Sequence, residues 1–290
     1  MNMRLKFLYL GGVLLTLSTS GCIVINGGGC SWGTGSSVWT EATEQRSIDT
    51  AGLTALQVRT HNGEIRFDGQ PAGSGPGVVT ITKKAGGITM ADAEAAIAAL
   101  DAFVEPIGDG TLRIGWRWKG IRRSTWNADV SYAITAPESL RLDAETHNGV
   151  VEAANAANDV RLVTHNGRIK VASRNGELHA ETHNGAINAT YEGDALTLIT
   201  HNGSITADLS RCGSVRGDVA THNGAVELIV GEQTSADLNC DTHNGRISFD
   251  TPITVSKSGR TTLEGRLGAG GQPLDIVTHN GSIRIKNTAG

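Results

Sequence analysis

Residues 142–189 read LDAETHNGVVEAANAANDVRLVTHNGRIKVASRNGELHAETHNGAINA and repeat the tetrapeptide THNG every 18 positions. From the second copy onward, the intervals between copies are 18, 18, 18, 21, 21 and 36 residues. A fixed period of this size is typical of repeat architectures, in which each unit covers the apolar side of its neighbour. The eight copies begin at Thr60, Thr146, Thr164, Thr182, Thr200, Thr221, Thr242 and Thr278.

Apolar and polar residues alternate on both sides of each THNG. The second residue after every glycine is Ile or Val and the fourth is also apolar, as in Ile169 and Val171. Alternation with a period of two predicts strands that bury one face. A single strand pair cannot bury its apolar side, so successive units must stack. We therefore predict an all-β fold, a right-handed parallel β-solenoid-like stack of two-strand rungs of about 18 residues.

The Asn-Gly pair in each copy predicts a tight turn, because glycine adopts positive φ angles that other residues resist. Stacking in register places identical residues about 4.8 Å apart, so we expect the asparagine amides to form a ladder. The expected turn ladder comprises Asn148, Gly149, Asn166, Gly167, Asn184, Gly185, Asn202, Gly203, Asn223, Gly224, Asn244 and Gly245.

The histidine of each copy is expected to point outward, because the adjacent threonine shares the inward phase of the strand. Three interpretations of this row stay open: a solvent-facing turn residue copied with the repeat, a Zn²⁺, Ni²⁺ or Cu²⁺ site, and a pH-responsive surface. Carboxylates do not accompany the row regularly, which weighs against the metal site. The candidate metal ligands are His147, His165, His183, His201, His222 and His243, and the row also contains His61 and His279.

The composition excludes some classes of partner. The chain has 25 Lys and Arg against 29 Asp and Glu, so no basic excess predicts nucleic-acid binding. It has 38 glycines but only 5 Trp, 3 Tyr and 4 Phe, which indicates a core of small and branched side chains.

Residues 1–21 have the pattern of an export signal, with Arg4 and Lys6 before the apolar stretch 7–17. That stretch is too short to span a bilayer. Residues 18–22, STSGC, resemble the lipobox of bacterial lipoproteins, which implies acylation of Cys22 and a membrane anchor. Ile23 follows the cysteine where an inner-membrane retention signal has Asp, so the resemblance favours the outer membrane. The alternative is an ordinary secretory signal with an incidental cysteine.

Residues 22–45 are rich in Gly and Ser and predict a flexible tether, followed by a repeat domain over 46–290. Residues 68–137 break the period and form an irregular insert. Within it we expect strands at 78–82, 111–118 and 129–135, and a helix over 90–104. A helix that covers the open end of the stack would prevent edge-to-edge association.

From Leu53 to Ile285 the chain resembles a bacterial β-strand-repeat family of unknown function called “putative adhesin”. The resemblance is carried by ALQVRTHNGEIRF at 55–67, VSYAITAP before LRLDAETHNG at 130–149, the NG-x-I turns, and LGAGGQPLDIVTHNGSIRI at 267–285. It implies a β-solenoid-like fold on the cell envelope and no established catalytic residues.

Catalysis finds little support in the sequence. Glu145 and Glu181 lie two rungs apart, and most equivalent positions are apolar, so no carboxylate pair for glycoside hydrolysis is predicted. No GxSxG nucleophile elbow is predicted, since the one match, GCSWG at 29–33, lies within the Gly/Ser-rich tether. Cys240 takes an inward position, and Cys212 belongs to the opposite turn, which makes a bridge between them doubtful.

We therefore predict a non-enzymatic envelope lipoprotein with a structural or adhesin-like role. Its THN edge would bind a polysaccharide or a protein surface, and no cofactor is predicted. The first alternative is a metal-binding envelope protein that uses the histidine row, with Zn, Ni or Cu. The second is a carbohydrate-active β-helix enzyme. Ligand identity and oligomeric state are not readable from the sequence.

Overall fold

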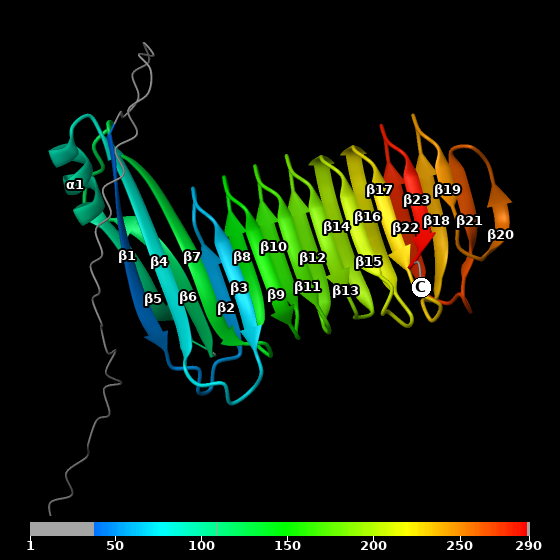
Figure 1. Ribbon diagram of the computed structural model, residues 1–290, viewed down its shortest axis with the longest axis horizontal. Coiled ribbons are helices and arrows are strands. Elements are labelled where there is room, and N and C mark those ends of the chain that lie inside the picture. Colours follow the sequence, from blue (N-terminus) through cyan, green and yellow to red (C-terminus); the bar gives the residue numbers. More distant parts are fainter. Residues whose placement is uncertain (1–37, 109, 289–290) are drawn as a thin grey trace, which may run out of the picture.

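The computed structural model describes residues 38–108 and 110–288, which form two large sheets and one helix, α1 (Met90–Ala99) (Figure 1). The 11-stranded sheet contains, in spatial order, β1 (Val38–Ile48), β4 (Gly77–Gly87), β7 (Asn127–Pro137), β3 (Ile65–Gln70), β9 (Val151–Ala156), β11 (Ile169–Ser173), β13 (Ile187–Tyr191), β15 (Ile205–Leu209), β17 (Val226–Val230), β23 (Ile283–Asn287) and β19 (Ile247–Phe249). The 12-stranded sheet contains β20 (Ile253–Ser258), β21 (Thr262–Leu267), β18 (Ala236–Thr242), β22 (Pro273–Thr278), β16 (Arg216–Asn223), β14 (Ala195–Asn202), β12 (Glu177–Thr182), β10 (Val160–Thr164), β8 (Arg141–Thr146), β2 (Ala55–Arg59), β6 (Thr111–Trp118) and β5 (Leu100–Pro106).

The repeats pair in parallel with their copies aligned. In the 12-stranded sheet Thr164 is the register partner of both Thr146 and Thr182, and in the 11-stranded sheet Ile169 pairs with Val151 and Ile187. The inward residues of both sheets are buried and form one apolar core. The all-β fold with two large, mostly parallel sheets is thus confirmed. The right-handed winding and the division into solenoid rungs stay predictions.

The last repeat does not lie at the end of the stack. β22 pairs in parallel with β16 on one side and with β18 on the other, so the Thr278 copy lies between the Thr221 and Thr242 copies. The 36-residue interval before Thr278 holds the antiparallel strands β20 and β21, and β21 covers the edge of β18. The interval is twice the 18-residue period, but it contains an antiparallel cap and not a further copy of the repeat.

The predicted tether is partly wrong. Residues 38–45 belong to β1, which pairs antiparallel with β4 from Val38 opposite Gly87 to Ile48 opposite Gly77. The reason is that the Gly/Ser-rich composition ends at Ser37, and the residues after it satisfy their backbone groups on β4. The predicted signal peptide, Cys22 and the tether up to residue 37 lie outside the described residues.

The insert joins both sheets. Its predicted strands correspond to β4, β6 and β7, but the predicted helix over 90–104 is too long. α1 ends at Ala99, and Leu100 has extended backbone angles (φ −80°, ψ 116°) because β5 pairs antiparallel with β6. Ala93 and Ala96 are the buried residues of α1, which packs against β1 and β4 at the N-terminal end of the stack (Figure 1). Within the described residues, no helix has both the length and the apolar character needed to cross a bilayer.

Candidate binding face along the histidine row

From the second copy onward, the threonine of each THNG hydrogen-bonds its turn to the neighbouring repeat. Its hydroxyl is buried and donates a hydrogen bond to the glycine carbonyl of the preceding copy in the stack, at 3.0 Å from Thr164 to Gly149 and 2.8 Å from Thr182 to Gly167. The same bond recurs from Thr146, Thr200, Thr221, Thr278 and Thr242. Thr60 of the first copy donates instead to the carbonyl of Val130 at 2.8 Å. The turns therefore stack in a fixed register.

The asparagines form a continuous ladder of side-chain amides. The Nδ2 of Asn166 donates to Oδ1 of Asn148 at 2.7 Å, and Nδ2 of Asn184 donates to Oδ1 of Asn166 at 2.8 Å. Such ladders stabilise stacked parallel strands because every amide is both donor and acceptor. In spatial order the ladder runs through Asn62, Asn148, Asn166, Asn184, Asn202, Asn223, Asn280 and Asn244.

The expected positive φ at the turn glycines is wrong. Among the eight THNG glycines, only Gly63 has a positive φ, at 139°. The others are required by close approach, since a Cβ on Gly167 would lie 1.9 Å from the carbonyl oxygen of Gly149. Gly149, Gly185, Gly203, Gly224, Gly245 and Gly281 have the same contact with the preceding glycine, at 1.8 to 1.9 Å.

The histidines next to these ladders are exposed and stack ring on ring. Consecutive ring centroids lie 4.7 to 4.9 Å apart, and the interplanar angles are 1° to 15° except for 29° between His61 and His147. The row runs in the order His61, His147, His165, His183, His201, His222, His279 and His243. We call this surface the histidine face.

A shallow groove of about 580 Å³ runs along part of the histidine face, from His61 to His201. Its other wall is formed by the outward residues that precede each threonine, among them Val163 and Ile199. Glu145 and Glu181 lie on the same wall, where Glu145 is paired with Arg59 at 3.4 Å. The groove therefore offers imidazole nitrogens on one side and a partly apolar strip on the other.

The geometry of the row bears on the metal alternative. No group of three or more His, Cys, Asp or Glu side chains within the described residues is arranged to hold a metal ion. The lone pair of an imidazole nitrogen lies in the ring plane, whereas the planes of His183 and His201 are 1° from parallel and their centroids 4.8 Å apart. An ion about 2.0 to 2.1 Å from both nitrogens would require the rings to rotate.

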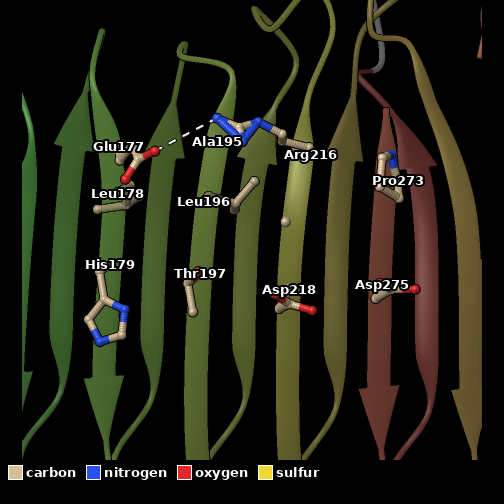
Figure 2. A pocket seen from close by; sticks show the side chains of 11 residues that line it. Glu177, Leu178, His179, Ala195, Leu196, Thr197, Arg216, Asp218, Pro273 and Asp275 are labelled. Carbon is tan, nitrogen blue, oxygen red and sulfur yellow. Dashed lines mark ion pairs between the residues drawn. The ribbon is translucent and has the colours of Figure 1, made fainter. Parts of the chain in front are cut away.

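A second concavity of about 380 Å³ lies on the outer face of the 12-stranded sheet and was not predicted from the sequence (Figure 2). His179, Thr197, Asp218 and Asp275 lie in one row across β12, β14, β16 and β22. Asp218 and Asp275 are register partners only because β22 inserts beside β16. Nothing in the spacing of the sequence could have brought these two carboxylates together.

The fold and the face define an all-β protein of two large, mostly parallel sheets that presents a regular, exposed row of identical side chains. No protein-family model matches the chain, and neither does any curated protein. Among solved structures, it is similar to a “putative cell adhesion protein” from Clostridium sporogenes, with 10% identity, 86% of this chain and 100% of that chain covered, and a TM-score of 0.36.

A “putative adhesin” from Bacteroides fragilis has 11% identity over 86% of this chain and 97% of that chain, with a TM-score of 0.35. A “putative lipid binding protein” from Parabacteroides distasonis has 11% identity over 84% and 96% of the two chains, with a TM-score of 0.42.

Proposed function

We propose that the protein is a non-enzymatic, lipid-anchored component of the cell envelope, a right-handed β-solenoid that binds an extended polymer along its histidine face. The ligand is either a polysaccharide or the surface of another protein. Anchoring through Cys22 in the outer membrane is part of this proposal. The observation that carries it is the row of exposed imidazoles spaced 4.7 to 4.9 Å apart, with a groove beside it from His61 to His201.

A repetitive face favours a repetitive ligand. Each repeat adds the same imidazole and asparagine amide at the same spacing, so a polymer of repeating units makes the same contact several times. Linked contacts of this kind raise the overall affinity without any single strong contact.

A catalytic role has weaker support from the side chains of the groove. Glu145 is paired with Arg59 at 3.4 Å, and Glu181 lies 3.4 Å from His179. The two carboxylates belong to β8 and β12, which are separated by β10, and each is already in contact with a neighbouring Arg or His side chain.

The experiment is co-sedimentation of the chain that starts at Ile23 with insoluble cellulose, chitin and peptidoglycan, together with capture on immobilised collagen and fibronectin. The test variant is His165→Ala, His183→Ala and His201→Ala combined. The matched control is His179→Ala, which removes a histidine outside the row. We expect at least one polymer to bind, with affinity at least about tenfold weaker in the triple variant because three contacts are lost. If no polymer binds, or the triple variant binds like the wild type, the proposal is wrong.

Metal binding by the histidine row is the second candidate, favoured by the short spacing between neighbouring imidazoles. Calorimetric titration with Zn²⁺, Ni²⁺ and Cu²⁺ at neutral pH tests it, with the same triple variant. Saturable binding that disappears in the triple variant but persists in His179→Ala would establish a metal site. Equal heats for wild type and triple variant would exclude it.

A further inference from the structure

The N-terminal end of the stack carries an exposed corner that adjoins the His61 end of the histidine face, since Nε1 of Trp116 near the end of β6 donates to Oγ1 of Thr60 at 3.2 Å. β1 begins, β4 ends and β7 begins there, since Val38 is opposite Gly87 and Gly86 is opposite Asn127. The segment 119–126, which links β6 to β7, and the start of α1 therefore meet at this end of the molecule (Figure 1). The corner surface is defined by Trp39, Ile88, Lys119, Ile121, Arg122 and Arg123.

Three large apolar side chains on the corner surface are exposed. Ile121 is 96% exposed, Ile88 61% and Trp39 45%. Single exposed apolar residues are ordinary, but these three come from three separate segments that the fold gathers at one end. Trp is enriched where a protein meets the interfacial region of a membrane, because its ring is apolar and its N–H is polar.

The carboxylate of Asp92 hydrogen-bonds to several residues at the corner. Oδ1 of Asp92 on α1 accepts hydrogen bonds from Nε1 of Trp126 at 2.8 Å and from Arg123 at 3.2 Å. Oδ2 of Asp92 accepts from the backbone N–H of Ile88 and from Thr125, each at 3.2 Å. These hydrogen bonds tie the 119–126 segment and Ile88 to α1.

The charged side chains next to the exposed Ile121 are mainly positive. Residues 119–125, KGIRRST, contain three cationic side chains and no acidic one. Arg123 is paired with Asp92, and Arg122 donates from Nε to the carbonyl of Trp126 at 2.9 Å while its guanidinium lies 6.0 Å from the Trp118 ring. Glu94 is an exposed carboxylate on the neighbouring α1. An exposed apolar side chain flanked by cationic side chains is the combination that binds anionic lipid surfaces.

The predicted lipid attachment residue lies close in sequence to this end of the stack. The described chain begins at Val38, and the predicted lipid attachment residue, Cys22, precedes it by 16 positions. Sixteen residues reach at most about 55 Å. A lipid anchor at Cys22 would therefore allow the corner surface to touch the bilayer.

We propose that the corner surface docks directly on an anionic lipid bilayer, with Ile121 and Trp39 at the headgroup boundary and Lys119 and Arg122 on the headgroups. The contact orients the stack so that its N-terminal end faces the membrane. It is independent of the ligand of the histidine face, and it does not require the acyl chain.

The test is sedimentation of the chain that starts at Ile23 with phosphatidylcholine vesicles, with and without phosphatidylglycerol, at low and high salt. That chain lacks the predicted acylation site and retains every strand of both sheets. The variants are Ile121→Ser and the pair Lys119→Gln and Arg122→Gln. Their controls are Val277→Ser and the pair Arg168→Gln and Lys170→Gln, all exposed residues away from the corner surface.

We expect the wild type to sediment with the phosphatidylglycerol vesicles and to be released by salt. Each corner variant should partition at least about fivefold more weakly, as removal of one or two lipid contacts implies, and the controls should match the wild type. Circular dichroism verifies that the variants are folded. Absence of vesicle binding, equal binding to neutral vesicles, or unchanged binding of both corner variants would overturn the proposal. None of these outcomes affects polymer binding by the histidine face.

Discussion

The glycine in each THNG copy shows how a single residue sets the distance between neighbouring repeats. The threonine hydroxyl bonds to the glycine carbonyl of the preceding copy, and that same carbonyl fills the space where a Cβ would stand. The asparagine ladder then aligns the side chains next to it. The histidines stack because the residues before and after them are held by these contacts.

A methyl group at one turn glycine should therefore destabilise the stack. Gly167→Ala places its Cβ 1.9 Å from the oxygen and 2.6 Å from the carbon of the Gly149 carbonyl, so the backbones must separate. We expect a loss of about 2 to 3 kcal/mol, as for other forced overpacking, seen as a lower urea midpoint. Gly213→Ala is the control, because no atom lies within 4 Å of its added Cβ. Equal midpoints for the two variants would contradict the close-contact account.

The two cysteines in the described part of the chain should be unreactive while the protein is folded. Cys212 and Cys240 are free and buried, and burial raises the pKa of each thiol to about 12. The thiolate is the reactive form, so both thiols should react with Ellman's reagent only after unfolding. A chain that starts at Ile23 and carries Cys30→Ser isolates these two. Rapid reaction of the folded protein at pH 8 would contradict their burial.

The raised pKa of these two thiols makes the stability of the folded protein depend on pH. Because the folded-state pKa is raised, the unfolded state loses the proton first, so stability is fully present below about pH 8.5 and declines as pH rises toward 12. We expect the urea midpoint of the wild type to be lower at pH 10 than at pH 8. The difference between the two midpoints should be smaller in Cys240→Ala than in the wild type. An identical decline in that variant would assign the effect to other groups.

At the scale of elements, the strands were predictable because alternation is a local property of the sequence. The end of α1 was not, since Leu100 becomes extended only through its pairing with β6. The start of β1 was missed for the same reason, because its partner β4 is remote in sequence. The histidine row followed from strand parity, but the reason for the turn glycines depends on a contact between repeats that no single copy contains.

β20 is an edge strand of the 12-stranded sheet, and it has features that limit the addition of a strand from another molecule. β20 has an irregular register between Val255 and Lys257, and Lys257 pairs with Glu264 at 2.8 Å. Edge strands with a bulge and a lysine resist pairing with another molecule. We expect Lys257→Val to promote concentration-dependent association, measured by light scattering. Lys170→Val, an exposed position in the interior strand β11, is the control, and equal behaviour of the two variants would contradict this role.

At the scale of the whole molecule, the position of the last repeat is the main feature that the sequence did not predict. β22 and β23 lie inside the stack, between β16 and β18 and between β17 and β19. The C-terminal residues thus connect the cap formed by β20 and β21 to the rest of the core. Spacing along the sequence cannot reveal an order of stacking that departs from the order of the chain.

Truncation after Gly271 tests this arrangement. It removes β22 and β23 and leaves β16 and β18 without their shared partner, so we expect an insoluble chain or a thermal midpoint lower by more than about 10 °C. Truncation after Thr288 is the control. If the last repeat were a terminal rung, the shorter chain would stay folded, with only a small change in its thermal midpoint.

The most direct test of the histidine face is a nuclear magnetic resonance titration that follows the imidazole C–H signals of the nine histidines as the bound polymer is added. The account predicts that the signals of the eight stacked histidines shift or broaden together, while His179, on the second concavity, keeps its position. Shifts confined to His179, or an unchanged spectrum at saturating polymer, would show that the ligand binds elsewhere and would contradict the proposed role of the row.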